Sequence, residues 1–86
     1  NQGEYEKALE WSEKCLEIEL KTLGPDHPST ASTYVSMGGV YDDMKEYEKS
    51  LEYLELALSI DLKSFEPEHP TISEVKFWIE HVKKKM

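Results

Sequence analysis

The sequence repeats itself with a period of 42 residues, and this repeat limits the possible folds more than any other feature. When the chain is shifted by 42 residues, 14 of the 25 positions from 4 to 28 are identical to those from 46 to 70. Several of the remaining pairs are conservative, such as Trp11 with Tyr53. Two copies of one structural unit therefore follow each other in the chain.

Within each copy the apolar residues recur every three or four positions, the spacing that places them along one face of a helix. The prolines in segments 24–28 and 66–70 must interrupt the helices, because proline lacks the backbone N–H and clashes with the preceding turn. Asp26 or His27 is expected to cap the helix that starts at Pro28. The pattern predicts an all-α chain with four helices, at about 4–22, 28–43, 46–64 and 70–84.

Short connections make neighbouring helices antiparallel, so each copy is expected to form a helical hairpin. A hairpin cannot bury its apolar face alone, and hairpins of this kind stack side by side into an α–α solenoid. We therefore expect a single repeat domain over residues 1–86. The chain begins at Asn1 without an initiator methionine. We expect it to be a fragment of a longer repeat array, since such arrays usually need about three repeats for stability.

Charge and composition argue against several classes of partner. The net charge of −8 comes from 18 acidic and 10 basic residues, all ten of them lysine, whereas nucleic-acid binding requires a basic face. No apolar run approaches the roughly 18 residues that a membrane helix needs. The single cysteine, Cys15, cannot form an intramolecular disulfide, which is typical of a reducing, cytoplasmic compartment. We expect neither nucleic acid nor membrane as a partner.

The residues that could carry chemistry have simpler structural explanations. His27 and His69 each precede a proline at a predicted helix start, so both are expected to serve the turn. His81 has no cysteine or carboxylate at a metal-ligand spacing. Cys15 aligns with Ala57 in the repeat and is expected to be a small buried residue, not a nucleophile. We expect no catalytic residue, metal or cofactor, and the chain is not expected to be an enzyme.

Seven residues around the middle of the chain follow a packing pattern of small and large side chains: Tyr34, Met37, Gly38, Tyr41, Ser50, Leu54 and Ala57. With Ala31 as position one, these residues resemble the signature of the tetratricopeptide repeat. The resemblance implies that the small ones stand where two helices approach most closely and that the large ones fill the gaps. The 42-residue period with its Gly-Pro-Asp-His-Pro linker is similar to the long variant of that repeat found in kinesin light chains.

The resemblance implies that the first helix of each tetratricopeptide repeat lines a concave groove. In this chain these are the predicted helices at 28–43 and 70–84. The groove residues that it implies are Ser32, Val35, Ser36, Gly39, Asp42, Glu74, Phe77, Trp78 and His81. A stripe of five other residues is expected to supply the core of the last helix: Ile72, Val75, Ile79, Val82 and Met86. Phe77 and Trp78 are surplus to that stripe, and surplus aromatic residues on a solvent face are candidates for a binding anchor. Alternatively, Trp78 packs under a neighbouring helix or against a further repeat.

These features predict a protein–protein interaction scaffold that binds a peptide or protein segment in the groove. The acidic balance of the chain favours a segment that carries basic residues. The alternative is a structural module that stacks with further copies or with a second chain, which would give a weak homo-oligomer. A third possibility is the regulatory arm of a larger multidomain protein.

Overall fold

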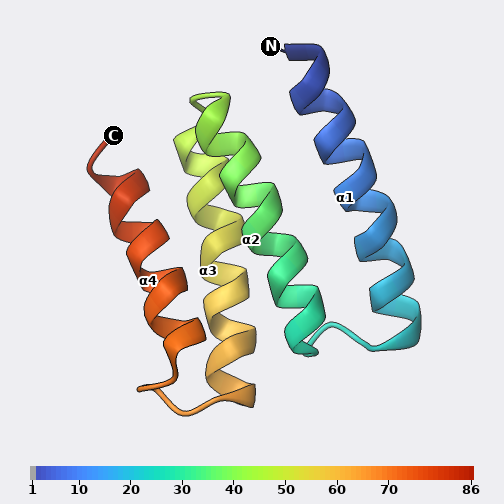
Figure 1. Ribbon diagram of the computed structural model, residues 1–86, viewed down its shortest axis with the longest axis vertical. Coiled ribbons are helices and arrows are strands. Elements are labelled where there is room, and N and C mark those ends of the chain that lie inside the picture. The colour runs from blue at the N-terminus through green and yellow to red at the C-terminus, as the bar shows by residue number, and fades with distance from the viewer. Residues whose placement is uncertain (1) are drawn as a thin grey trace.

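The computed structural model describes residues 2–86, which contain four α-helices (Figure 1). The helices are α1 (Gln2–Thr22), α2 (Pro28–Asp43), α3 (Tyr47–Ser64) and α4 (Pro70–Lys83). They run alternately in opposite directions, and each lies beside the next one in the chain (Figure 1). The expected all-α fold of antiparallel helical hairpins is confirmed. The observed helix ends differ from the expected ones by at most two residues.

The two proline-containing turns start α2 and α4 in the same way. His27 and His69 occupy the N-cap positions. The Nδ1 atom of each ring accepts a hydrogen bond from the backbone N–H two residues later, at 3.0 and 3.1 Å. The proline that follows each histidine fits the first helical position, because an N–H there would have no partner in the helix. Both histidines therefore serve their turns, and His27 rather than Asp26 is the cap.

The apolar core lies between α2, α3 and α4. Removing these side chains from water is the main favourable contribution to folding. The buried apolar residues are Ala31, Met37, Leu54, Ala57, Ile60, Ile72, Val75, Ile79 and Val82. The expected stripe of α4 is present except at its end. Met86 is 61% exposed, because the helix ends at Lys83 and the last residues leave the core.

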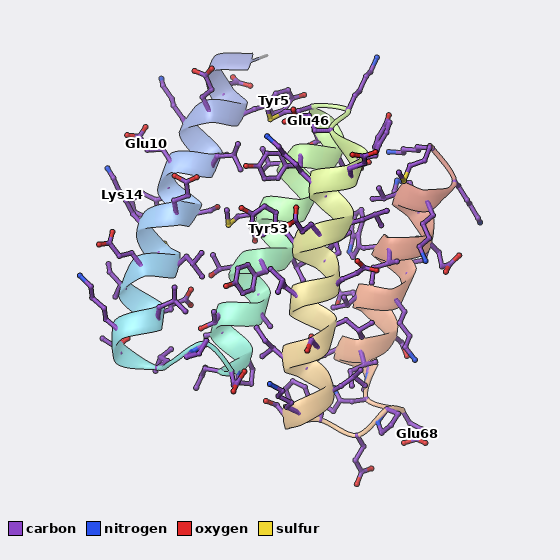
Figure 2. The ribbon with its side chains drawn as sticks, turned by 180° about the vertical axis from the view of Figure 1, so that it is seen from behind. Tyr5, Glu10, Lys14, Glu46, Tyr53 and Glu68 are labelled. Atoms are coloured by element: carbon purple, nitrogen blue, oxygen red, sulfur yellow. The ribbon has the colours of Figure 1, made fainter. Side chains whose placement is uncertain are left out.

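The first helix is packed on fewer sides than the third. α3 packs against both α2 and α4, whereas α1 packs mainly against α2. Cys15 of α1 is therefore half-buried, while Ala57, its counterpart in α3, is fully buried. The expectation that Cys15 is buried is thus wrong. Glu10 and Lys14 point into solvent from the outer side of α1 (Figure 2).

Candidate functional site

A pocket of about 120 Å³ lies among α2, α3 and α4. It is formed by the first half of α2, the last turn of α3 and the first half of α4, which meet at the bottom of Figure 1. Its lining residues are Ser32, Val35, Asp61, Thr71, Glu74 and Val75. Three of the residues predicted for the groove, Ser32, Val35 and Glu74, are thus brought together here.

An aromatic cluster continues from the pocket along α4. Glu74 is followed on the same helical face by Phe77, Trp78 and His81, since residues three and four apart in a helix are neighbours. The Phe77 ring lies edge-on to Trp78, with the ring centroids 5.9 Å apart. It is stacked on the His81 ring at 6.1 Å, and Trp78 meets His81 edge-on at 5.6 Å. One face of α4 therefore carries a carboxylate at the pocket and three rings beyond it.

The two large aromatic residues of this cluster differ in exposure. Phe77 is 64% exposed. Trp78 is half-buried and packs against the apolar core, together with Val35 and other partly buried side chains. The expectation that both residues are surplus to the core is therefore correct for Phe77 only. Trp78 supports the helix packing, and Phe77 is the ring that lies largely in solvent.

The other residues predicted for the groove lie in α2 and differ among themselves. Ser36 is exposed, and its hydroxyl donates a hydrogen bond to the Ser32 carbonyl at 3.2 Å. Gly39 faces open space on the side where a side chain would project. Asp42 is only 7% exposed, and its carboxylate lies 3.1 Å from the ammonium of Lys85. The Asp42 charge is therefore already neutralised within the chain and is not open to a partner.

Asp61 is the most unusual group in the pocket, because its side chain is charged and only 2% exposed. Burial raises the pKa of its carboxyl above the ordinary value for aspartate, and the nearby His69 opposes part of that rise. The folded chain thus holds this proton more tightly than the unfolded chain does. Stability from this group is fully present below the unfolded-state pKa and is lost as the pH rises through the folded-state pKa.

At pH 7 the charge on Asp61 is therefore expected to lower the stability of the fold. Asp61→Asn keeps the size of the side chain and removes the charge, so we expect a gain of about 1 kcal/mol in the free energy of unfolding at pH 7. For a domain of this length, that gain corresponds to a rise of roughly 4–8 °C in the thermal midpoint. Thermal unfolding followed by circular dichroism would measure it.

The matched control is Glu55→Gln, which removes one charge from an exposed position of α3. It corrects for the smaller net charge of the variant, and we expect it to change the midpoint little. The advantage of Asp61→Asn should shrink as the pH falls through the raised pKa of Asp61, because the wild-type carboxyl then takes up its proton. A lower midpoint for Asp61→Asn than for Glu55→Gln at pH 7 would contradict this account of the buried charge.

Three pocket residues, Asp61, Thr71 and Val75, were not among the predicted groove residues. The repeat contains a signal for the first of them. Asp61 matches Glu19 in the other copy, so an acid occupies the same place near the end of two otherwise apolar helix faces. Thr71 and Val75 could be assigned to the pocket only once α3 and α4 were placed side by side.

Two other hollows of the surface are not lined by any of the predicted groove residues. These larger hollows, of about 380 and 370 Å³, surround the turn between α2 and α3 at the opposite end of the molecule. Tyr5 and Glu46 line the second of these (Figure 2). Within residues 2–86, no three histidine, cysteine or acidic side chains are grouped so that they could hold a metal ion. None of the described helices is both long and apolar enough to cross a membrane.

A comparison with known protein families is consistent with this all-α, four-helix fold. The family model of the tetratricopeptide repeat matches residues 1–74. The chain belongs to the tetratricopeptide repeat family. Tetratricopeptide repeats are helical modules that typically mediate protein interactions, and they are generally scaffolds without catalytic activity. No curated protein matches the chain.

With Ala31 at the first position of a tetratricopeptide repeat, α2 and α3 are the two helices of one repeat. α4 is then the first helix of the next repeat, and α1 is the second helix of the preceding one. The pocket thus lies between the first helices of two successive tetratricopeptide repeats, with the second helix of the earlier repeat beneath them.

Proposed function

We propose that this chain is a protein-interaction scaffold that holds a peptide or protein segment across α2 and α4. The observation that carries the proposal is that the pocket and the exposed Phe77 ring follow each other on one face of α4. A segment lying along this face would contact Ser32 and Val35 of α2 and the aromatic cluster of α4. Large aromatic side chains that are exposed beside a pocket are the usual anchors of such contacts.

The charge of this face favours a partner segment with basic residues. The chain carries a net charge of −8, and Asp61 and Glu74 place two carboxylates at the pocket. Opposite charge on the partner increases the rate of association and selects against acidic segments. An affinity on the order of micromolar, about −8 kcal/mol, is expected for a single segment on a face of this size.

Two further features support finer assignments within this proposal. The 42-residue period and the Gly-Pro-Asp-His-Pro linker support the long, kinesin-light-chain-like variant of the repeat. The lone Cys15 supports a reducing, cytoplasmic compartment. The family match over residues 1–74 supports a single repeat domain.

Phe77→Ala is expected to weaken binding of a peptide by about 10- to 30-fold, because the loss of a central aromatic anchor typically costs about 2 kcal/mol. The peptides would be selected from a random display library against the wild-type chain, and affinities would be measured by isothermal titration calorimetry. Because Phe77 is exposed, its replacement should leave the helical circular dichroism signal unchanged.

The matched control is Trp11→Ala, which removes an aromatic ring that is 70% exposed on α1, away from the pocket. It should leave the peptide affinity within about twofold of wild type, since surface substitutions away from a binding site have small effects. Equal losses for the two variants, or no loss for Phe77→Ala in a folded chain, would refute the assignment of this face.

A second function is favoured by the uncovered face of α1. In the second copy of the repeat, Tyr53 stacks on Tyr34 and Tyr41 of α2, with ring centroids 5.9 and 5.4 Å apart. Figure 2 shows Tyr53 at the centre of the molecule. Trp11 stands at the matching place in α1 but is exposed, as is Ile18 two turns further along. The exposure of these two residues supports a second function, in which α1 stacks against another helix. That helix would belong to a further repeat, to a second copy of the chain or to the remainder of a larger protein.

Sedimentation velocity at several concentrations would distinguish stacking between copies from segment binding. Self-association should raise the sedimentation coefficient with concentration, and Trp11→Ala should abolish that rise while Phe77→Ala should not. A coefficient that does not change with concentration would count against association of copies.

A further inference from the structure

The buried carboxylate of the pocket differs from its counterpart in the first copy of the repeat. Glu19 of α1 accepts a hydrogen bond from the hydroxyl of Thr33 in α2, at 2.5 Å. A shift of 42 residues turns this pair into Asp61 and Val75. The acid in the second copy is one carbon shorter, and the valine has no hydroxyl. Asp61 therefore lacks the partner that Glu19 has.

Nothing else in the described part of the chain replaces that partner. No hydrogen bond or ion pair joins the Asp61 carboxylate to another side chain of residues 3–86, and His69 affects it only through a longer-range electrostatic interaction. The residue is only 2% exposed. No Asp61 oxygen is both fully buried and without a hydrogen-bond partner. Since the carboxylate has no such partner, its oxygens must reach the pocket that Asp61 lines. A buried charge of this kind is costly unless a counter-charge reaches it.

The rest of the pocket has the chemistry that surrounds an inserted cation. The hydroxyls of Ser32 and Thr71 can accept hydrogen bonds, and Glu74 adds a second negative charge. Val35 and Val75 provide apolar walls. The volume of about 120 Å³ has room for about four water molecules, at roughly 30 Å³ each in the liquid. No lining residue is basic, so an anion would find no favourable partner there.

We propose that this pocket binds the ammonium group of a lysine side chain from the bound segment, with Asp61 as its buried counter-charge. The inference rests on the proposed function, because the lysine belongs to a segment held across α2 and α4. An ammonium group has three donors and no acceptor, which suits the Asp61 carboxylate and the two hydroxyls. The methylene stem of lysine would lie along Val35 and Val75. The planar guanidinium of arginine is wider and needs paired acceptors in one plane, so lysine fits better.

The experiment uses blocked alanine pentapeptides with lysine, arginine or norleucine at the central position. Binding is measured from the amide chemical shifts of the wild-type chain in two-dimensional NMR spectra. The lysine peptide is expected to bind with a dissociation constant on the order of millimolar and to shift the amides of residues 32, 35, 71, 74 and 75. The norleucine peptide, which has a similar shape but no charge, should bind at least about tenfold more weakly, as should Asp61→Asn with the lysine peptide.

Two further variants separate the pocket from the general acidity of the chain. Glu80→Gln removes an exposed charge from α4 outside the pocket and should leave lysine binding unchanged. The double substitution Asp61→Glu with Val75→Thr keeps the charge but rebuilds the Glu19–Thr33 pair, so the carboxylate is occupied within the chain. It should lose lysine binding to the same extent as Asp61→Asn.

Equal binding of the lysine and norleucine peptides would overturn the proposal. Lysine binding that survives both in Asp61→Asn and in the double variant would overturn it too. Arginine binding as tight as lysine binding would overturn the preference for an ammonium group. These outcomes are distinct from failure of the proposed function. If library-selected peptides bind in a Phe77-dependent manner and Asp61→Asn does not affect them, the face is correct and the lysine pocket is not.

Discussion

Leu54→Ala is expected to lower the free energy of unfolding by about 2–5 kcal/mol, the typical cost of removing a fully buried leucine. Leu54 is 2% exposed and belongs to the apolar cluster that joins α2, α3 and α4. The smaller side chain would leave a cavity where those helices meet. Folded domains of this length have about 4–13 kcal/mol of stability in total. The variant should therefore unfold at a much lower temperature or denaturant concentration.

The matched control for this prediction is Leu56→Ala, which lies in the same helix and removes the same side-chain atoms. Leu56 is 45% exposed, so its replacement should cost less than about 1 kcal/mol. Chemical denaturation followed by circular dichroism would measure both values. Similar costs for the two variants would mean that the helices do not meet at Leu54 as the structure has them.

Gly38→Ala and Gly39→Ala are expected to change stability in opposite directions, although the two glycines are adjacent in α2. A Cβ atom added to Gly38 would lie 2.9 Å from Cγ of Leu54 and 3.3 Å from the backbone oxygen of Ser50. These contacts are too short, so the Leu54 side chain or α3 itself would have to shift. Overpacking of a core costs about 1–3 kcal/mol, of which the better helix propensity of alanine offsets about 1 kcal/mol. We expect a net loss.

A Cβ atom added to Gly39 meets no heavy atom of another residue within 4 Å. Gly39→Ala should therefore show only the gain in helix propensity, about 1 kcal/mol of added stability. Thermal midpoints of the two variants, measured under the same conditions, test the pair together. If Gly38→Ala were the more stable of the two, the close approach of α2 and α3 would be refuted. Gly39→Ala also adds a methyl group on the side assigned to the groove, so its peptide affinity reports on that assignment.

The sequence predicted the helices well because their signals are local. The three- and four-residue apolar spacing and the prolines at 28 and 70 act within one or two turns, and α2 begins at Pro28 as α4 begins at Pro70. Gly38 could likewise be assigned to a close approach from the repeat pattern. The errors at Cys15, Trp78 and Met86 concern residues whose burial depends on what lies beside them. Cys15 has neighbours on fewer sides than Ala57, and Met86 lies beyond the end of α4.

The candidate site was predicted only in part, since a groove depends on how separate helices are placed. The family pattern brought Ser32, Val35 and Glu74 into the list, and these three residues do meet at the pocket. It also listed Asp42, whose charge is taken up by Lys85, 43 positions further along the chain. It did not list Asp61, which comes from the second helix of a pair rather than the first.

The sequence by itself determined the helices, their antiparallel order and the repeat to which they belong, because the helices follow from local spacing and the repeat from the match between the two copies. The tertiary structure alone decided which side chains remain free to act. Phe77 and Trp78 are neighbours in one helix, yet only the packing of α4 buries one ring against the core and leaves the other in solvent. Asp61 and Glu19 hold the same place in the repeat. Only the residue that each meets on the next helix determines whether its carboxylate is satisfied or open to a partner.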